Sequence, residues 1–218
     1  MLSSGDVRRF VHPILLRLWL KHAKEKELVT RIGGLTLRVS PSVFHPRFFG
    51  SSVIFAEHLA EIGLEGKQFL DLGTGSGIVG LFAARAGAKV TAVDINPRAV
   101  ECASQNATRA GLSLDCRHSD LFSSLPGQTF DVIAWNPPFF PKTANSISEA
   151  ALYAGEDYAV VRRFAAEVPR HLKAAGKVFL VLSKDLDIDK WNSIFSGRLK
   201  IRRERRWGWE TMAVVEIV

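Results

Sequence analysis

Residues 67–80 read KQFLDLGTGSGIVG, and this stretch decides the fold. It predicts a buried strand at Lys67–Gly73, followed at once by a turn with glycines at positions 75 and 77 and by a helix at Ile78–Arg85. Glycine permits a tight turn, and its missing side chain lets a ligand approach the backbone at the N-terminus of a helix. The stretch therefore predicts a β-α unit with a ligand at the turn.

The alternation of strand and helix continues toward the C-terminus. Further strands are predicted at Ala88–Asp94, Leu112–His118, Phe130–Trp135 and Gly176–Ser183. Helices are predicted from the Asn96-Pro97 cap to Gly111, at Asp157–Leu172 and at Asp187–Phe195. The final segments, RLKIRRERRW and TMAVVEIV, predict two antiparallel strands. Repeated β-α units that end in an antiparallel pair indicate an α/β fold with a mostly parallel, doubly wound, Rossmann-like sheet.

Upstream of this stretch the patterns predict a smaller extension. A helix is predicted at Ser51–Gly63, with a serine N-cap and a glycine stop, and a hairpin at Leu28–Val39 around Gly33-Gly34. An amphipathic helix, restarted at Pro13, is predicted near the N-terminus, where we expect neither a secretory signal nor a membrane span. We divide the chain into an N-terminal extension, residues 1–42, and one catalytic domain, residues 43–218.

Composition bounds the functional classes. The 218 residues suffice for one sizeable core, and 29 Lys plus Arg against 22 Asp plus Glu give a formal charge of +7, which favours an anionic partner such as RNA, DNA or a ribosome. Cys102 and Cys116 lack metal-ligand spacing and predict reduced cysteines in the cytoplasm. The six histidines form no H-x-x-x-H pattern, so we expect no metal site.

Polar side chains stand at the ends of the predicted strands. Asp71 and the glycine turn follow the first strand, Asp94 ends the second, Asp120 follows the third and Asn136 the fourth. In doubly wound sheets ligands bind beyond the carboxyl ends of the strands, so these groups line one crevice. Gly75–Gly80 also matches the dinucleotide pattern G-x-G-x-x-G, but the Asp71 carboxylate would repel a pyrophosphate and attract an ammonium or sulfonium group. We therefore predict S-adenosylmethionine (SAM), with its ribose diol on Asp94 and its adenine amino group at Asp120.

Several motifs together carry a family resemblance. LDLGTGSG, AVDINPRAVECASQNA, SDLF, FDVIAWNPPF and ALYAGEDY occur in this order between about Val43 and Leu182. The chain resembles the HemK-type methyltransferases of release-factor glutamine and the broader "methyltransferase small" class. The resemblance implies a seven-stranded class I methyltransferase fold, SAM as cofactor and S-adenosylhomocysteine as product. It implies cofactor contacts at Asp71, Gly73, Thr74, Gly75, Gly77, Asp94, Ile95, Asp120, Leu121 and Asn136.

The segment AWNPPFFPK, residues 134–142, can then be interpreted in chemical terms. The prolines cannot continue a sheet, because they lack the backbone donor, but they fix a corner. The Asn136 side-chain oxygen and the Pro137 carbonyl can accept the two N–H bonds of a planar nitrogen, and Phe139 can cover its flat face. We predict Asn136, Pro137 and Phe139 as the catalytic residues.

The identity of the substrate stays open at this point. A glutamine side chain of a release factor or ribosome-associated protein is favoured, and an exocyclic amino group of adenine or guanine in RNA or DNA is the alternative. A SAM-binding module without turnover is a third possibility. His45-Pro46-Arg47 matches the Pro-Arg of the bacterial release-factor enzymes, but FFGSS replaces the acidic residues that follow there. The short upstream region suggests a partner subunit for recognition, and RRERRW (Arg202–Trp207) is either a nucleic-acid patch or a solvated edge strand.

Overall fold

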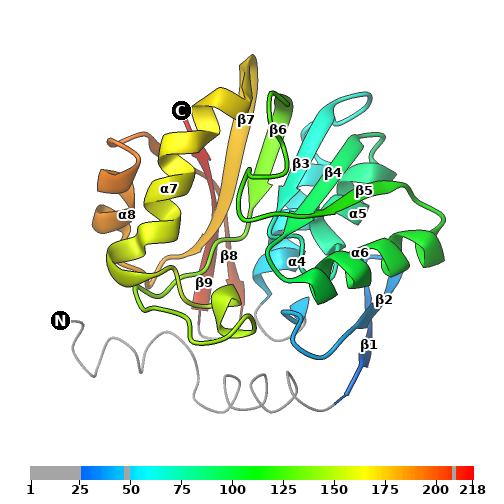
Figure 1. The fold of residues 1–218 in the computed structure, drawn as a ribbon. Helices are drawn as coiled ribbons and strands as arrows, with labels where there is room; N and C mark the ends of the chain where they lie inside the picture. The colour runs from blue at the N-terminus through cyan, green and yellow to red at the C-terminus, as the bar shows by residue number, and fades with distance from the viewer. Residues whose placement is uncertain (1–25, 47–49, 208–209) are drawn as a thin grey trace.

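The structure, a computed structural model, describes residues 26–46, 50–207 and 210–218, so the helix predicted around Pro13 lies outside the described residues. Its main sheet contains β3 (Gln68–Leu72), β4 (Lys89–Asp94), β5 (Leu114–His118), β6 (Phe130–Trp135), β7 (Leu172–Ser183), β8 (Leu199–Trp207) and β9 (Glu210–Ile217). The order across the sheet is β5-β4-β3-β6-β7-β9-β8. Strands β3 to β7 pair in parallel, whereas β9 runs antiparallel between β7 and β8. The predicted fold class is confirmed (Figure 1).

Helices cover both faces of this sheet. On one face lie α4 (Ser51–Ala60), α5 (Ile78–Arg85) and α6 (Pro97–Ala110), and on the other lie α7 (Ala159–Glu167) and α8 (Ile188–Ile194) (Figure 1). Successive strand residues point to opposite faces, so Phe69 packs with the first group and Leu70 with the second. The two apolar clusters are therefore the two sides of a strand pattern that is hydrophobic throughout.

Capping residues explain the bounds of α6. The Asn96 side-chain oxygen accepts a hydrogen bond from the Arg98 backbone N–H at 3.0 Å, and Pro97 occupies the first helical position. Gly111 ends the helix in the left-handed conformation, with φ of 66°. Proline fits the first turn because its missing N–H has no partner there, and a left-handed glycine commonly stops a helix. The prediction from Asn96 to Gly111 is confirmed.

The predicted helix at Asp157–Leu172 is wrong at both ends. Two short 3-10 segments, η2 (Glu156–Tyr158) and η3 (Val168–His171), flank α7, and β7 already begins at Leu172 instead of the predicted Gly176. Asp157 and Tyr158 have positive φ and cannot belong to a regular helix. Pro169 has no backbone N–H to donate to a carbonyl of the preceding turn, so the regular helix ends at Glu167 and a 3-10 segment follows.

The start of α4 differs from the prediction in a way that matters for the site. Gly50, not Ser51, is the N-cap residue, and it has a left-handed φ of 61°. A Cβ atom at Gly50 would lie 2.3 Å from Cδ2 of Trp207, so the chain has no room for a side chain there. Glycine meets both demands, and the serine hydroxyls that follow are free to make other contacts.

The N-terminal hairpin is confirmed as β1 (Leu28–Ile32) and β2 (Leu35–Val39), which pair antiparallel around Gly33-Gly34. It packs on the main domain through Asn106 of α6, whose side chain is fully buried. The Asn106 oxygen accepts from the Arg38 N–H, and its Nδ2 donates to the carbonyls of Arg38 and Ser76, each at 2.9 Å. One amide thus joins the hairpin to the glycine turn. The boundary predicted between residues 42 and 43 stays a prediction.

The basic run on β8 is largely paired with acidic side chains. Arg203 donates to Glu61 at 2.8 Å, Arg205 forms an ion pair with Glu57, and Arg202 forms one with Glu216 of β9. Glu57 of α4 and Glu61, the C-cap residue of this helix, are about one helical turn apart, which matches the spacing of alternate residues on a strand. The run therefore attaches α4 to the edge of the sheet. Within the described residues, no helix is long and apolar enough to cross a membrane.

Candidate active site

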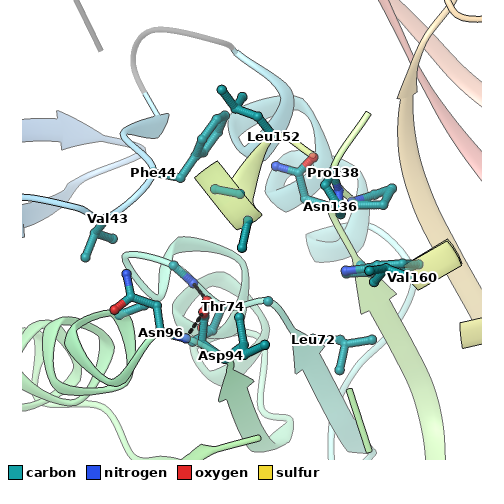
Figure 2. Close-up of a pocket in the computed structure, with 18 of the residues that line it drawn as sticks. Val43, Phe44, Leu72, Thr74, Asp94, Asn96, Asn136, Pro138, Leu152 and Val160 are labelled. Atoms are coloured by element: carbon teal, nitrogen blue, oxygen red, sulfur yellow. Dashed lines mark hydrogen bonds between the residues drawn. The ribbon is translucent and has the colours of Figure 1, made fainter. Parts of the chain in front are cut away.

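A cavity of about 370 Å³ opens at the carboxyl ends of β3, β4 and β6. This volume lies at the lower end of the range of small-molecule sites, roughly 300–1,000 Å³. Figure 2 shows Asp94 and Asn96 on one wall and Asn136 and Pro138 on the opposite one, with Phe44 and Leu152 along the upper side of the view. The position is the one that a doubly wound sheet favours for ligands, because strand order reverses there.

The glycine turn, residues 73–77, forms the floor of one side of the cavity, which we call the cofactor side. Gly77 is the N-cap of α5 with φ of 85°, and a Cβ atom there would lie 3.1 Å from Ala103 of α6. The Thr74 N–H donates to the Val93 carbonyl at 3.0 Å, and the Gly77 N–H donates to the Thr74 carbonyl at 2.9 Å. These bonds hold the turn between β3 and α5 in one conformation.

Asp71 is buried beneath the turn. Its Oδ2 accepts a hydrogen bond from the Thr74 hydroxyl at 2.6 Å and another from the Gly80 N–H at 2.8 Å. Burial raises the pKa of Asp71 to about 6, because removal from water disfavours the charged carboxylate more than the two donors favour it. Asp71 therefore organises the turn from within, in addition to lining the cavity.

Asp94 crosses from β4 to the turn. Its Oδ2 accepts from the Gly75 N–H at 2.9 Å, and its Oδ1 accepts from the Asn96 N–H at 2.8 Å (Figure 2). Burial raises its pKa, whereas these backbone donors lower it. The Asn96 Nδ2 donates to the Ser42 carbonyl at 2.9 Å, so this amide also fixes the segment that follows the hairpin. The Asp94 carboxylate is thus held in place by two backbone donors at the edge of the cavity.

The loop after β5 closes the cofactor side. Leu121 is buried with φ of 48°, a conformation that non-glycine residues adopt at a cost of about 1–3 kcal/mol. The Ser119 hydroxyl donates to the Leu121 carbonyl at 2.8 Å and supports this conformation. Arg163 of α7 donates to the Asp120 Oδ2 at 3.0 Å. The Asp120 carboxylate thus lines the cavity and also forms a surface ion pair with Arg163.

The corner at residues 136–140 forms the opposite side of the cavity, which we call the acceptor side. The Asn136 Nδ2 donates to the hydroxyls of Ser51 and Ser52 of α4, at 3.2 Å in each case. Pro137 and Pro138 are buried, and Phe139 and Phe140 follow as partly buried rings. An amide whose N–H groups meet two hydroxyls leaves its oxygen as the atom for another donor.

The remaining walls come from distant parts of the chain. Residues 140–155 form a loop closed by backbone bonds between Phe140 and Leu152 and between Ala154 and Phe140, at 3.0 and 2.7 Å. Ile147 of this loop lines the cavity although it is 43% exposed. Glu210 and Met212 of β9 line the cavity on the acceptor side, since β9 lies beyond β6 and β7 in the sheet. Burial raises the pKa of Glu210.

Most of the predicted site residues line this one cavity. They are Asp71, Gly73, Thr74, Gly75, Asp94, Ile95, Asp120, Leu121, Asn136, Pro137 and Phe139. Gly77 is not among the lining residues and acts as a helix cap. The sequence reading missed the lining contributed by Ser42, Phe44, Ser52, Asn96, Ile147 and Glu210. Asn96 and the serines carried a signal as helix-capping types, but their place at the site depends on long-range packing.

The residues present fit SAM. The charged side chains among the described lining residues are Asp71, Asp94, Asp120 and Glu210, and all of them are acidic. SAM carries an ammonium and a sulfonium group beside one carboxylate, so an acidic cavity favours it on electrostatic grounds. A pyrophosphate would face the same carboxylates without a cation from these residues. The described part of the chain contains no group of three or more His, Cys, Asp or Glu placed to hold a metal ion.

Residues 34–206 match the protein family described as "Methyltransferase small domain". The chain belongs to this family. It is a SAM-dependent methyltransferase. The hypothesis that the glycine turn binds a dinucleotide is therefore wrong, and so is the hypothesis of a SAM-binding module without turnover. The predicted cofactor is thereby confirmed, and the HemK-type resemblance is supported by the relatives of this methyltransferase.

These relatives have different substrates in their names. A Methanocaldococcus jannaschii protein named "Putative protein N5-glutamine methyltransferase" is 33% identical over 162 residues, which cover 72% of this chain and 80% of that one. The release factor glutamine methyltransferase of Koribacter versatilis is 36% identical over 197 residues, 80% of this chain and 67% of that one. The ribosomal RNA small subunit methyltransferase C of Alcanivorax borkumensis is 30% identical, and the match covers 69% of this chain but only 43% of that one.

Solved structures share the fold of the methyltransferase. A methyltransferase from Pyrococcus furiosus aligns with a TM-score of 0.64 and 21% identity, over 94% of this chain and 96% of that one. The 16S rRNA N2 guanosine methyltransferase of T. thermophilus, in complex with AdoMet and guanosine, aligns with a TM-score of 0.63 and 24% identity. That alignment covers 88% of this chain and half of the other.

Proposed function

We propose that this methyltransferase transfers a methyl group from SAM to the side-chain amide nitrogen of a glutamine in a protein substrate. The observation that carries the proposal is the acceptor corner, where the Asn136 amide is oriented by two hydroxyls beside the buried Pro137. A glutamine amide offers two N–H donors in one plane, and this corner offers two acceptors, the Asn136 side-chain oxygen and the Pro137 carbonyl.

The residues of the chain act by positioning. SAM, when bound, supplies a methyl group on a positively charged sulfur. Asn136 and Pro137 hold the N–H groups of the acceptor amide, and Phe139 covers its flat face. The prolines restrict the backbone of the corner, so the acceptors need little reorganisation before reaction. No strong base is required before attack, because the nitrogen becomes more acidic as it is alkylated.

The charge of the cavity favours an amide over a nucleotide. The four charged side chains among its described lining residues are acidic, and Glu210 lies on the acceptor side. A neutral amide enters such a cavity without electrostatic cost, whereas the phosphates that accompany a nucleic-acid base would be repelled. The relatives named for glutamine methylation, which this chain matches over most of its length, support the same substrate class.

Several finer points belong to the same proposal. The protein substrate is a release factor or a ribosome-associated protein, and the reaction takes place in the cytoplasm. A partner subunit contributes to recognition of that protein. Asp94 holds the ribose hydroxyls of SAM, Asp120 lies at its adenine amino group, and Asp71 lies toward its methionine ammonium group.

A second candidate is methylation of the exocyclic amino group of adenine or guanine in RNA or DNA. The formal charge of +7 and the relatives named for ribosomal RNA favour it. A base amino group is also planar and has two N–H bonds, so the same corner can hold it. The paired state of Arg202, Arg203 and Arg205 weakens this candidate, because these charges already have acidic partners.

Transfer from radiolabelled SAM into a cell lysate separates the two candidates. Aliquots of the reaction are treated with protease, RNase or DNase, and the Asn136→Ala variant serves as the inactive control. We expect the label to disappear with protease alone and amino-acid analysis to yield methylglutamine. Label that is sensitive to RNase or DNase and resistant to protease would replace the glutamine proposal with the nucleic-acid one.

A further inference from the structure

The Asn136 side chain is held by a helix that lies far from it in the sequence. Its Nδ2 lies 3.2 Å from the Ser51 hydroxyl and 3.2 Å from the Ser52 hydroxyl, across 85 and 84 residues. Both serines are buried, with 1% and 6% of their surface exposed. Ser51 does not cap α4, because Gly50 has that position. The two hydroxyls therefore serve a purpose other than capping the N-terminus of the helix.

The geometry has a chemical consequence for the amide. An asparagine side chain carries two N–H donors on one atom and one acceptor oxygen on the other. When Nδ2 meets two hydroxyls, rotation of the amide about its last bond would break both contacts. The two contacts use the N–H groups and leave the oxygen as the atom that can accept from the N–H of an acceptor nitrogen.

The position of α4 itself is fixed by three residues of β8. The left-handed Gly50 packs against the Trp207 ring, with no space for a Cβ atom. Arg203 and Arg205 bind Glu61 and Glu57 farther along the helix. The N-terminus and the body of α4 are thus attached to the same strand. Serines on a helix held at several points can orient a neighbouring amide to within a fraction of an ångström, which positioning catalysis demands.

We propose that Ser51 and Ser52 are positioning residues for methyl transfer, which fix the plane of the Asn136 amide and keep its oxygen directed at the acceptor nitrogen. The inference rests on the proposed function of Asn136. The two hydroxyls are partly redundant, since either alone still restrains the amide. Loss of both leaves the amide free to rotate, so the chemical step slows while the SAM site is unchanged.

The test compares Ser51→Ala, Ser52→Ala and the double variant in single-turnover transfer at saturating SAM. We expect each single variant to lose a few-fold in rate and the double variant at least about tenfold, since small misplacement at a reacting centre can cost up to about 100-fold. The affinity for SAM stays within about twofold of wild type. Ser51→Thr and Ser52→Thr retain the hydroxyl and restore most of the rate. Ser193→Ala, which removes an exposed hydroxyl on α8, is the matched control.

A double-mutant cycle separates positioning from a general loss of structure. In the Asn136→Ala background, removal of both hydroxyls is expected to have no further effect on the rate, because there is no amide left to orient. An equal loss in both backgrounds would overturn the proposal, as would a double variant as fast as wild type. If the double variant fails to fold, the cycle with Ser52→Ala alone decides.

A second readout does not depend on the substrate. In ¹⁵N-labelled protein the side-chain NH₂ signals of Asn136 are assigned by their absence in Asn136→Ala. Hydrogen exchange of these protons is expected to be slow in wild type and at least about tenfold faster in the double serine variant. Equal exchange would overturn the orienting contact. Slow exchange in a protein that methylates no glutamine would instead retain the contact and reject the proposed substrate.

Discussion

The two halves of the cavity are built in different ways. On the cofactor side, the two buried carboxylates bond to residues close in sequence: Asp71 to residues three and nine positions away, and Asp94 to residues two and nineteen away. On the acceptor side, Asn136 bonds to serines 84 and 85 positions away. The cofactor side is one local motif repeated over two strand ends, whereas the acceptor side is assembled from α4, β6 and β9.

This difference suits the cofactor side to binding one ligand and the acceptor side to determining the substrate. Local hydrogen bonds fix the glycine turn wherever the motif occurs, so the cofactor side is suited to one ligand. The acceptor side depends on how separate elements pack, and exchanging one element changes the fit for the substrate.

The sharpest way to separate the halves is Asn136→Ala. It removes the acceptor that we propose holds the reacting nitrogen, and it leaves the glycine turn, Asp71 and Asp94 in place. We expect single-turnover transfer to fall by at least about 100-fold, as for loss of one positioned transition-state contact. The SAM dissociation constant, measured by calorimetry, stays within a few-fold of wild type.

Asn136→Asp is the matched variant for this experiment. A carboxylate still accepts from the substrate, and the Ser51 and Ser52 hydroxyls can donate to it instead of accepting. We expect a smaller loss than for Asn136→Ala. Retained turnover in Asn136→Ala would show that the corner only ends a strand.

Asp94→Ala breaks the other half. The Asp94 carboxylate accepts two backbone N–H bonds that shape the cofactor side, and we place the ribose hydroxyls on the same group. Loss of charge-assisted hydrogen bonds costs roughly 1.5–3 kcal/mol, so SAM affinity should fall about 10- to 100-fold. Transfer at saturating SAM should change much less, and an unchanged calorimetric isotherm would contradict the assignment.

The protonation of Asp71 gives a smaller, graded effect within the cofactor half. The pKa of Asp71 is raised by burial to about 6, and a cationic ligand prefers the ionised carboxylate. SAM affinity should therefore rise about tenfold between pH 5 and pH 7, as the carboxyl loses its proton. Calorimetry across this range measures it. Asp71→Asn should flatten the rise, and a rise that persists in this variant would assign it to another group such as Asp94.

The same pKa predicts how stability depends on pH without the ligand. The folded-state pKa of Asp71, about 6, lies above the unfolded value, so the folded protein binds the proton more tightly. This contribution to stability is complete below about pH 4 and is lost as the pH rises through 6, up to roughly 3 kcal/mol. Urea unfolding of wild type and Asp71→Asn at pH 4.5 and 7 isolates it: only wild type should show this loss.

The smallest effect is expected from the basic run. Arg205 and Glu57 have 45% and 38% of their side chains exposed, and such surface pairs contribute about 0–1 kcal/mol. Arg205→Ala should therefore lower the free energy of unfolding by at most about 1 kcal/mol. Its affinity for RNA should match that of wild type in a salt titration. A clear loss of RNA affinity in Arg205→Ala would make β8 a nucleic-acid surface and favour the second candidate function.

The sequence by itself determined the sheet, the turn and the cofactor. Phe69-Leu70 and Ile133-Ala134 lie in apolar runs that only strands buried on both faces require, and the caps of α6 lie within three residues of the helix end that they satisfy. Asp71, the glycines and Asp94 make their contacts within the same β-α-β segment. Each of these residues lies in the same β-α-β segment as its partner, so a local sequence pattern is sufficient to predict the contact.

Only the tertiary structure decided the acceptor side. Ser51 fits a helix cap by residue type, and the Trp207 ring that forces glycine into that position is more than 150 residues away. The basic run of β8 reads as a nucleic-acid patch until α4 brings Glu57 and Glu61 against it. A hydroxyl or a guanidinium group can satisfy many partners, and its type alone does not choose among them. Packing makes that choice, because burial leaves each polar group with the partners that the fold places within reach.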